Sequence, residues 1–107
     1  MERFRKLLCV AASKSVMRQN HAALLAKGDK VIAIGCNKFL SYGRKSIHAE
    51  EIVLRKIPRN YDRRDLTLYV IRINRRGKFV YSFPCKRCQI LIKRAGIRYI
   101  YYSVNGE

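Results

Sequence analysis

Hydrophobic residues recur at helical spacing in three separate parts of the chain, which predicts three amphipathic helices. The first covers about residues 2–16, the second ends at Pro58, which cannot continue a helix, and Gly96 is well placed to end the third. The positions that carry these patterns are Phe4, Leu7, Leu8 and Ala11, then Ala49, Ile52, Val53 and Ile57, then Cys88, Leu91, Ile92 and Ala95.

Residues that favour strands lie between the predicted helices. Two apolar runs, 22–26 and 31–34, are separated by four residues that include Gly28 and Asp29, and this predicts a hairpin because both residues tolerate turn dihedrals. The run 66–71 is almost continuously apolar, as expected for a central strand covered on both faces. Residues 79–81 predict a short extended piece, and residues 97–102 predict a last strand.

The predicted order is helix, hairpin, helix, strand, helix, strand. Strands that alternate with helices in the second half imply parallel pairing through right-handed crossovers. We therefore expect an α/β layered sandwich, with a mixed sheet of about four strands and helices packed on it. A length of 107 residues fits one domain over residues 1–107.

The composition is strongly basic, with 24 Lys and Arg against 7 Asp and Glu and a formal net charge of +17. Such a surface attracts polyanions and phosphates, and salt weakens that attraction. The basic residues are spread from Arg3 to Arg98 without one dominant block. Two interpretations therefore stay open: a nucleic acid or nucleotide partner, or a solvated surface with no partner.

The chain shows neither a run of 18 apolar residues nor an N-terminal signal peptide, since charged residues interrupt its start. We expect an intracellular protein, in the cytoplasm or nucleus, with no membrane partner. A disulfide framework is not expected there, so the close pair Cys85 and Cys88 is either metal-binding or redox-active. Cys9 and Cys36 are interpreted as small buried hydrophobic residues.

Two of the predicted helices begin with residues suited to metal chemistry. The second begins with His48-x-Glu50 and the third with Pro84-Cys85-x-x-Cys88. The two cysteines point to one side of a first turn, where we expect the helix dipole to lower the pKa of both thiols. Two thiolates and an imidazole bind zinc with an open fourth position for water. Glu50 would reach that water if its helix aims its N-terminal end at the metal.

This combination resembles the signature of the zinc-dependent cytidine/deoxycytidylate deaminase superfamily, His/Cys-x-Glu followed by Pro-Cys-x-x-Cys. The resemblance covers nearly the whole chain and implies one CMP/dCMP-type deaminase domain with a cytidine deaminase-like fold. It implies Zn²⁺ as cofactor, with His48, Cys85 and Cys88 as ligands. It further implies that a zinc-bound hydroxide converts cytosine to uracil in a nucleoside or nucleotide, with Glu50 as proton shuttle.

The resemblance also implies which residues contact the substrate: Asn37, Ala49 and Phe83. Asn37 closes the second predicted strand, where family members commonly hold the ribose, although Asn at a strand end is otherwise a turn former. The basic residues of the following loop would suit a substrate phosphate; they are Lys38, Arg44 and Lys45.

Two departures from family patterns keep other functions open. Polynucleotide cytidine deaminases typically carry Ser-Trp-Ser before Pro-Cys, whereas this chain has Tyr81-Ser82-Phe83. Relatives usually continue through another helix and strand that separate the substrate classes, and without them a sheet edge is left that a homo-oligomer would cover. The alternatives are a polynucleotide cytosine or adenine deaminase and a catalytically inactive, zinc-stabilised nucleic-acid-binding module. Glu50 argues against the inactive module, because a structural zinc needs no carboxylate beside it.

Three further features have ordinary interpretations that we prefer. His21 is expected to be structural, and Glu51 is expected to be an acid favoured by the helix dipole. The terminal tyrosines 99, 101 and 102 resemble a base-stacking platform, but aromatic residues in strands more often pack within a sheet.

Overall fold

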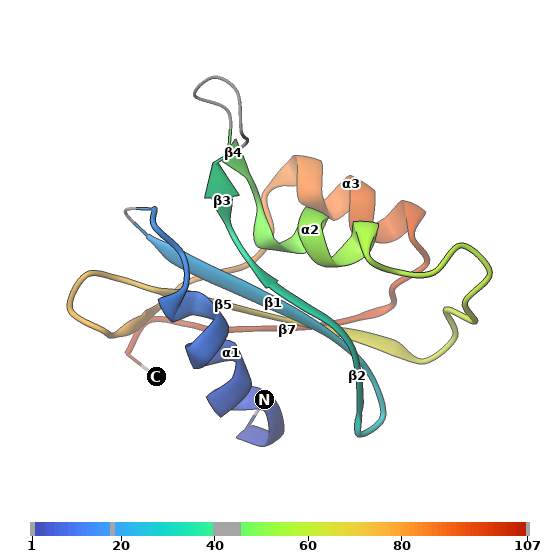
Figure 1. The fold of residues 1–107 in the computed structure, drawn as a ribbon, viewed down its shortest axis with the longest axis horizontal. Coiled ribbons are helices and arrows are strands. Elements are labelled where there is room, and N and C mark those ends of the chain that lie inside the picture. Colours follow the sequence, from blue (N-terminus) through green and yellow to red (C-terminus); the bar gives the residue numbers. More distant parts are fainter. Residues whose placement is uncertain (1, 18, 40–45, 107) are drawn as a thin grey trace.

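The chain forms a five-stranded mixed sheet with helices on both faces, in a computed structural model that describes residues 2–17, 19–39 and 46–106 (Figure 1). The elements are, in order, η1 (Glu2–Phe4), α1 (Arg5–Ser13), β1 (Asn20–Lys27), β2 (Lys30–Cys36), β3 (Lys38–Phe39), β4 (Ser46–Ile47), α2 (Ala49–Arg55), β5 (Leu66–Ile73), β6 (Phe79–Val80), α3 (Lys86–Arg94) and β7 (Tyr99–Tyr102).

The sheet has the order β2-β1-β5, and both β6 and β7 pair with β5. Strand β1 is antiparallel to both of its neighbours, whereas β5 and β7 are parallel. Because α3 lies between β5 and β7 in the chain, it forms the crossover connection that parallel strands require. The predicted hairpin is present, and Gly28 turns it with a φ of +60°, which glycine adopts without steric cost.

The structure differs from the sequence prediction in three main respects. The first helix ends at Ser13, and the segment after Asn37 contributes a small antiparallel ladder between β3 and β4. The third difference is a fifth strand, since β6 joins the sheet beside the end of β5. The reason is the tight turn between them, in which the Asn74 side chain accepts hydrogen bonds from the backbone N–H groups of Arg76 and Lys78.

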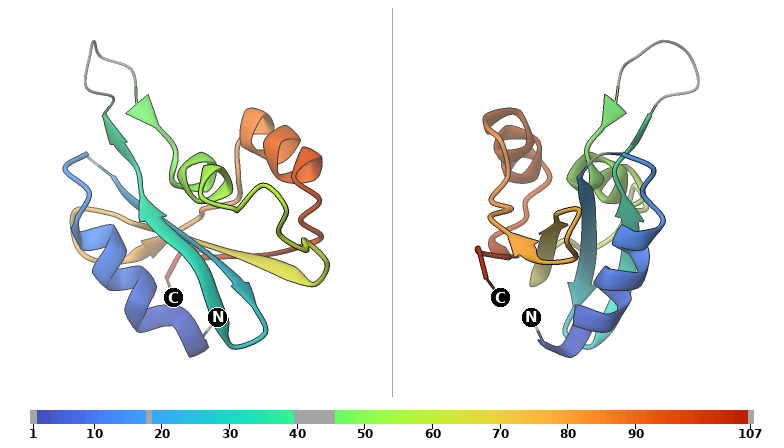
Figure 2. Two further views of the ribbon diagram at one scale, coloured as in Figure 1. Left: turned by 45° about the vertical axis from the view of Figure 1, so that its right-hand side comes forward. Right: turned by 90° about the vertical axis from the view of Figure 1, so that its left-hand side faces the viewer.

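The alternation of side chains along β1 separates two hydrophobic cores. Ala23 and Leu25 belong to the core under α2 and α3, whereas Ala22, Leu24 and Ala26 belong to the core under α1. Figures 1 and 2 accordingly show α1 on one side of the sheet and α2 with α3 on the other. Within the described ranges, no helix has the length and apolar character needed to cross a bilayer.

Helix α2 lies very close to β2 at Gly35. A Cβ atom at this position would be 2.9 Å from Cγ2 of Ile52, which belongs to α2. The Lys56 ammonium, just beyond the helix, donates a hydrogen bond of 2.8 Å to the Ile34 carbonyl. Glycine therefore permits the distance at which α2 is held above the sheet.

Candidate metal centre and active site

The starts of α2 and α3 meet above the sheet and bring three motif residues together (Figure 1). His48 Nδ1 lies 3.4 Å from Cys88 Sγ and 3.7 Å from Cys85 Sγ, and the three ligand atoms are all within 4.8 Å of one another. Tetrahedral zinc, with bonds of about 2.3 Å to sulfur and about 2.0–2.1 Å to nitrogen, separates such atoms by roughly 3.6 Å. The cluster fits zinc, with three protein ligands and a fourth position for another group.

Two of these residues are helix caps whose side chains are left free for a metal. His48 is the N-cap of α2 and Cys85 is the N-cap of α3, both with extended backbone, and neither side chain bonds to its own helix in the described structure. Pro84 precedes the cap instead of starting the helix, and its carbonyl accepts a hydrogen bond from Gln89 Nε2. Cys88 lies three residues after the cap, so its sulfur faces the same end of α3.

Two buried serines hold the segment that leads into Cys85. The Ser82 hydroxyl donates to the Val70 carbonyl and accepts a 2.8 Å hydrogen bond from the Ser103 backbone N–H. The Ser103 hydroxyl donates to the Val80 carbonyl at 2.7 Å. These bonds attach both β6 and the residue after β7 to β5, and they fix the position from which Pro84 and Cys85 start.

Glu50 places a buried carboxylate in the first turn of α2, next to this cluster. Its side chain is only 2% exposed, and Oε1 has no hydrogen-bond partner among the described residues. Burial raises the pKa of Glu50 above its ordinary value, and this outweighs the opposing effects of its own backbone N–H, His48 and Arg72. A carboxyl group with a raised pKa and a free oxygen is suited to moving protons near neutral pH.

The Cys88 thiol differs from the expectation that the helix dipole lowers its pKa. Burial raises the pKa of Cys88, and the negative charge of Glu50 adds to the effect. The dipole is outweighed because Cys88 belongs to the hydrophobic core under α2 and α3. Deprotonation of this thiol therefore depends on a nearby cation, as zinc would provide.

Glu51 links the two helices, a role that the sequence interpretation missed. Its carboxylate is almost fully buried and forms ion pairs with Arg55 of α2 at 2.5 Å and with Arg87 of α3 at 3.1 Å. Arg87 lies between the two cysteines in sequence, so Glu51 ties the cysteine segment to α2. The only sequence signal was the presence of two basic residues between Cys85 and Cys88.

We expect Glu51→Gln to lower the free energy of unfolding by about 1–2 kcal/mol, because it removes a charge that two guanidinium groups contact at the edge of the core. Both arginines are largely exposed, which keeps the loss below that of a fully buried pair. Urea unfolding of the zinc-loaded protein measures this loss, and a change below about 0.3 kcal/mol would contradict it.

The predicted substrate contacts fall into different environments. Asn37 is buried: its Oδ1 accepts hydrogen bonds from Ser15 Oγ and the His21 N–H, and its Nδ2 donates to the Gln19 carbonyl. The second N–H of this amide has no acceptor among the described residues, and its contact with a substrate remains a prediction. The Ala49 side chain is fully buried in the core, which leaves its backbone for a contact.

Of the remaining predicted contacts, Phe83 is partly exposed two residues before Cys85. Lys38 is exposed in β3. Arg44 and Lys45 lie outside the described residues.

His21 lies beside the metal centre, in β1, with its ring 6.4 Å from that of His48 between centroids. Its Nε2 accepts a hydrogen bond from Arg72 Nε. Burial, followed by the charges of Arg72 and His48, lowers the pKa of His21 from 6.5 to about 4. Arg72 was also missed from the sequence, although it is a charged residue near the end of an apolar strand.

This pKa predicts how His21 affects stability. Between pH 6.5 and about 4 the unfolded chain binds a proton at His21 that the folded chain does not bind, so stability falls as the pH is lowered through this window. The loss is up to about 3 kcal/mol at 1.36 kcal/mol per pKa unit. Denaturant titrations at pH 7 and pH 4.5 should show a smaller pH-dependent loss in His21→Gln. Equal losses in both proteins would contradict the assignment.

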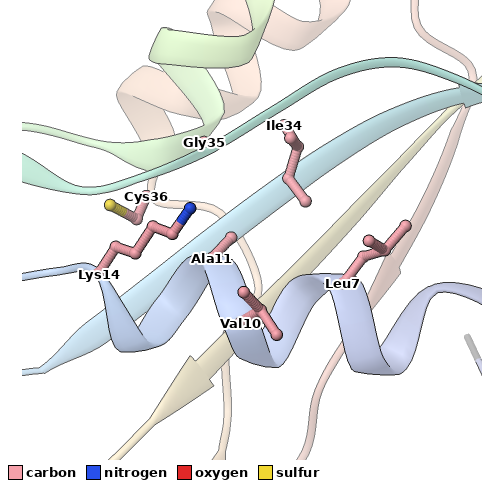
Figure 3. Close-up of a pocket in the computed structure, with 7 residues that line it drawn as sticks. All are labelled: Leu7, Val10, Ala11, Lys14, Ile34, Gly35 and Cys36. Atoms are coloured by element: carbon pink, nitrogen blue, oxygen red, sulfur yellow. The ribbon is translucent and has the colours of Figure 1, made fainter.

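A separate apolar pocket lies on the other face of the sheet, between α1 and β2 (Figure 3). It is lined by Leu7, Val10, Ala11, Lys14, Ile34, Gly35 and Cys36. Its lining includes none of the clustered metal-ligand residues and neither Glu50 nor Phe83, so the candidate chemistry belongs to the α2–α3 side.

A sheet covered by helices on both faces, with a His/Cys/Cys cluster at two helix starts, places the chain among zinc-binding α/β proteins. A family model described as the cytidine and deoxycytidylate deaminase zinc-binding region matches residues 1–104. The chain therefore belongs to this family, whose zinc-binding character agrees with the cluster. A search of curated proteins gave no match.

Solved structures show the same fold at low sequence identity. The dCMP deaminase of cyanophage S-TIM5 in apo form is 23% identical, with a TM-score of 0.72 over 94% of this chain and 79% of that chain. The same enzyme in complex with dCMP and dUMP is 20% identical, with a TM-score of 0.70 over 94% and 78%. A mutant cytidine deaminase from Mycobacterium tuberculosis is 22% identical, with a TM-score of 0.59 over 94% and 83%.

Proposed function

We propose that the chain is a zinc-dependent hydrolytic deaminase that converts a cytosine base to uracil in a nucleoside or nucleotide. The observation that carries this proposal is the position of Glu50, a buried carboxylate with an unpartnered oxygen beside three zinc-type ligands. A purely structural zinc site would need a fourth protein ligand instead of a carboxylate held near the metal. The family and the dCMP and dUMP bound by a structural neighbour support the substrate class.

In this proposal, His48, Cys85 and Cys88 hold the metal, and residues 1–107 act as one deaminase domain. When bound, zinc would act as a Lewis acid that lowers the pKa of a water molecule, so that the water can lose a proton and its oxygen can attack C4 of cytosine. Glu50 accepts the proton lost by that water and donates it to N3 of the ring. Glu50 then takes the proton of the hydroxyl group added at C4 and passes it to the departing amino group, which leaves as ammonia while C4 becomes a carbonyl carbon.

The surrounding side chains position Glu50 and the substrate. Arg72 lies near enough to oppose the effect of burial on the Glu50 pKa, so it limits how far that pKa rises. The remaining amide N–H of Asn37 and the backbone of Ala49 are proposed to contact the sugar and the base. The Phe83 ring is proposed to line the entrance beside Cys85.

A substrate panel tests the proposal. Zinc-loaded protein is offered cytidine, deoxycytidine, their monophosphates and single-stranded oligonucleotides, and both ammonia and uracil product are measured. We expect ammonia and the uracil-containing product to form in equal amounts from at least one of these substrates. A folded protein with one zinc per chain that releases neither product from any of them would overturn the proposal.

A further inference from the structure

Exposed aromatic side chains gather at the segment that leads into Cys85. Tyr81, Phe83 and Tyr102 form a cluster whose ring centroids are between 5.0 and 6.4 Å apart. Tyr81 is 52% exposed, and Phe83 and Tyr102 are each 37% exposed. These ring surfaces are accessible to a partner.

Tyr102 of the aromatic cluster lies on the same side of the sheet as the metal centre. Along β7, Ile100 packs against the core under α2 and α3. Side chains two residues apart in a strand share a face, so Tyr102 points to this side as well. Phe83 is joined to Cys85 through Pro84 alone. By the same alternation, Tyr99 points to the opposite face, and Tyr101, which stacks on Tyr69, does too.

The charge of the segment that carries the aromatic cluster restricts the kind of partner. Residues 66–106, which form β5, β6, α3 and β7, contain no Asp or Glu. They contain nine basic residues, namely Arg72, Arg75, Arg76, Lys78, Lys86, Arg87, Lys93, Arg94 and Arg98. A second copy of the chain would bring the same charge against itself, whereas a phosphate backbone would be attracted.

We propose that the aromatic cluster stacks a base next to the target nucleotide, so that the target belongs to a single-stranded nucleic acid. Aromatic rings combined with a basic surface bind single strands with little sequence preference, because every base has a ring face to stack. In a duplex the base faces are already stacked on neighbouring bases, so they are not available to the rings. The part of this inference that concerns deamination of the target base rests on the proposed function. The stacking of a base on the aromatic cluster can be tested without any turnover.

The matched variants are Tyr81→Leu and Tyr99→Leu, which remove similarly exposed rings, one inside the aromatic cluster and one outside it. Tyr81 can be replaced without loss of its hydrogen bond to Asn105, since the bond is made by its backbone N–H. Fluorescence anisotropy with labelled 12-nucleotide thymidine DNA and uridine RNA, at fixed salt, measures binding to the zinc-loaded proteins. We expect Tyr81→Leu to weaken binding of at least one strand about tenfold, Tyr81→Phe to restore it, and Tyr99→Leu to change it less than twofold.

Several results would overturn the inference. They are equal losses in the two leucine variants, no loss in either, duplex binding as tight as single-strand binding, or self-association in sedimentation that Tyr81→Leu abolishes. Comparing the affinities for the DNA and RNA strands then identifies which nucleic acid the protein prefers. Turnover of dCMP with none of a cytosine-containing oligonucleotide would reject the inference and leave the proposed function intact. Ring-dependent binding with no turnover of any substrate would reject the proposed function and leave the stacking surface intact.

Discussion

Replacement of Glu50 by Gln is expected to lower kcat for deamination by about 10²–10⁴-fold, the usual contribution of a general acid–base group. Gln is nearly the same size as Glu but cannot accept a proton from water or deliver one to a ring nitrogen. Zinc content should stay at one ion per chain, because Glu50 is outside the His48, Cys85 and Cys88 cluster. Steady-state kinetics together with metal analysis of the same sample measures both quantities.

Glu51→Gln is the matched control, since it removes the same charge one residue along α2 from a similarly buried position. Because Glu51 forms ion pairs with Arg55 and Arg87, its role is to hold α2 against α3. The free energy of unfolding should therefore change in Glu51→Gln, while kcat stays within a few-fold of the original value. A Glu50→Gln protein that keeps both full zinc and full kcat would show that another group moves the proton.

Removal of zinc is expected to lower the melting temperature by about 10–20 °C. Zinc present at 100 times its dissociation constant stabilises the folded chain by about 2.7 kcal/mol. In a chain of this size each kcal/mol corresponds to about 4–8 °C. Thermal unfolding followed by circular dichroism, with and without a chelator, measures the shift.

Cys85→Ser separates loss of the metal from loss of packing, because Cys85 is exposed and its sulfur fills no cavity. This variant should melt near the temperature of the chelated protein, and a chelator should lower its melting temperature no further. Cys36→Ser, at a half-buried cysteine outside the cluster, should retain one zinc per chain. A chelator shift that persists in Cys85→Ser would place the metal elsewhere.

The order of the elements could be predicted from the sequence because its signals are local. Helical spacing, the turn at Gly28 and the apolar run from Leu66 each depend on neighbouring residues. The parallel pairing of β5 with β7 followed from the helix between them. By contrast, the short extended piece expected at residues 79–81 could not be assigned a partner strand, because the pairing of β6 depends on a side chain–backbone contact in the turn at Asn74.

In the candidate site, too, the features with local sequence signals could be predicted, whereas those that depend on tertiary contacts could not. The motif spacing and the family resemblance pointed to His48, Cys85 and Cys88, but spacing could not say that two of them cap helices. Glu51 was interpreted as an ordinary first-turn acid because its contact with Arg87 joins residues far apart in sequence. The raised pKa of Cys88 also depends on tertiary burial, which a helix-dipole argument does not include.

The contact at Gly35 couples the back of α2 to the spacing within the metal centre. His48 and Glu50 lie at the start of α2, whereas the sulfur atoms of Cys85 and Cys88 belong to the start of α3. A methyl group at Gly35 would push Ile52 away from the sheet and carry the imidazole and the carboxylate along as a unit. A substitution at Gly35 would therefore be expected to change the distance between the imidazole nitrogen and the sulfur atoms without altering any of the three clustered residues.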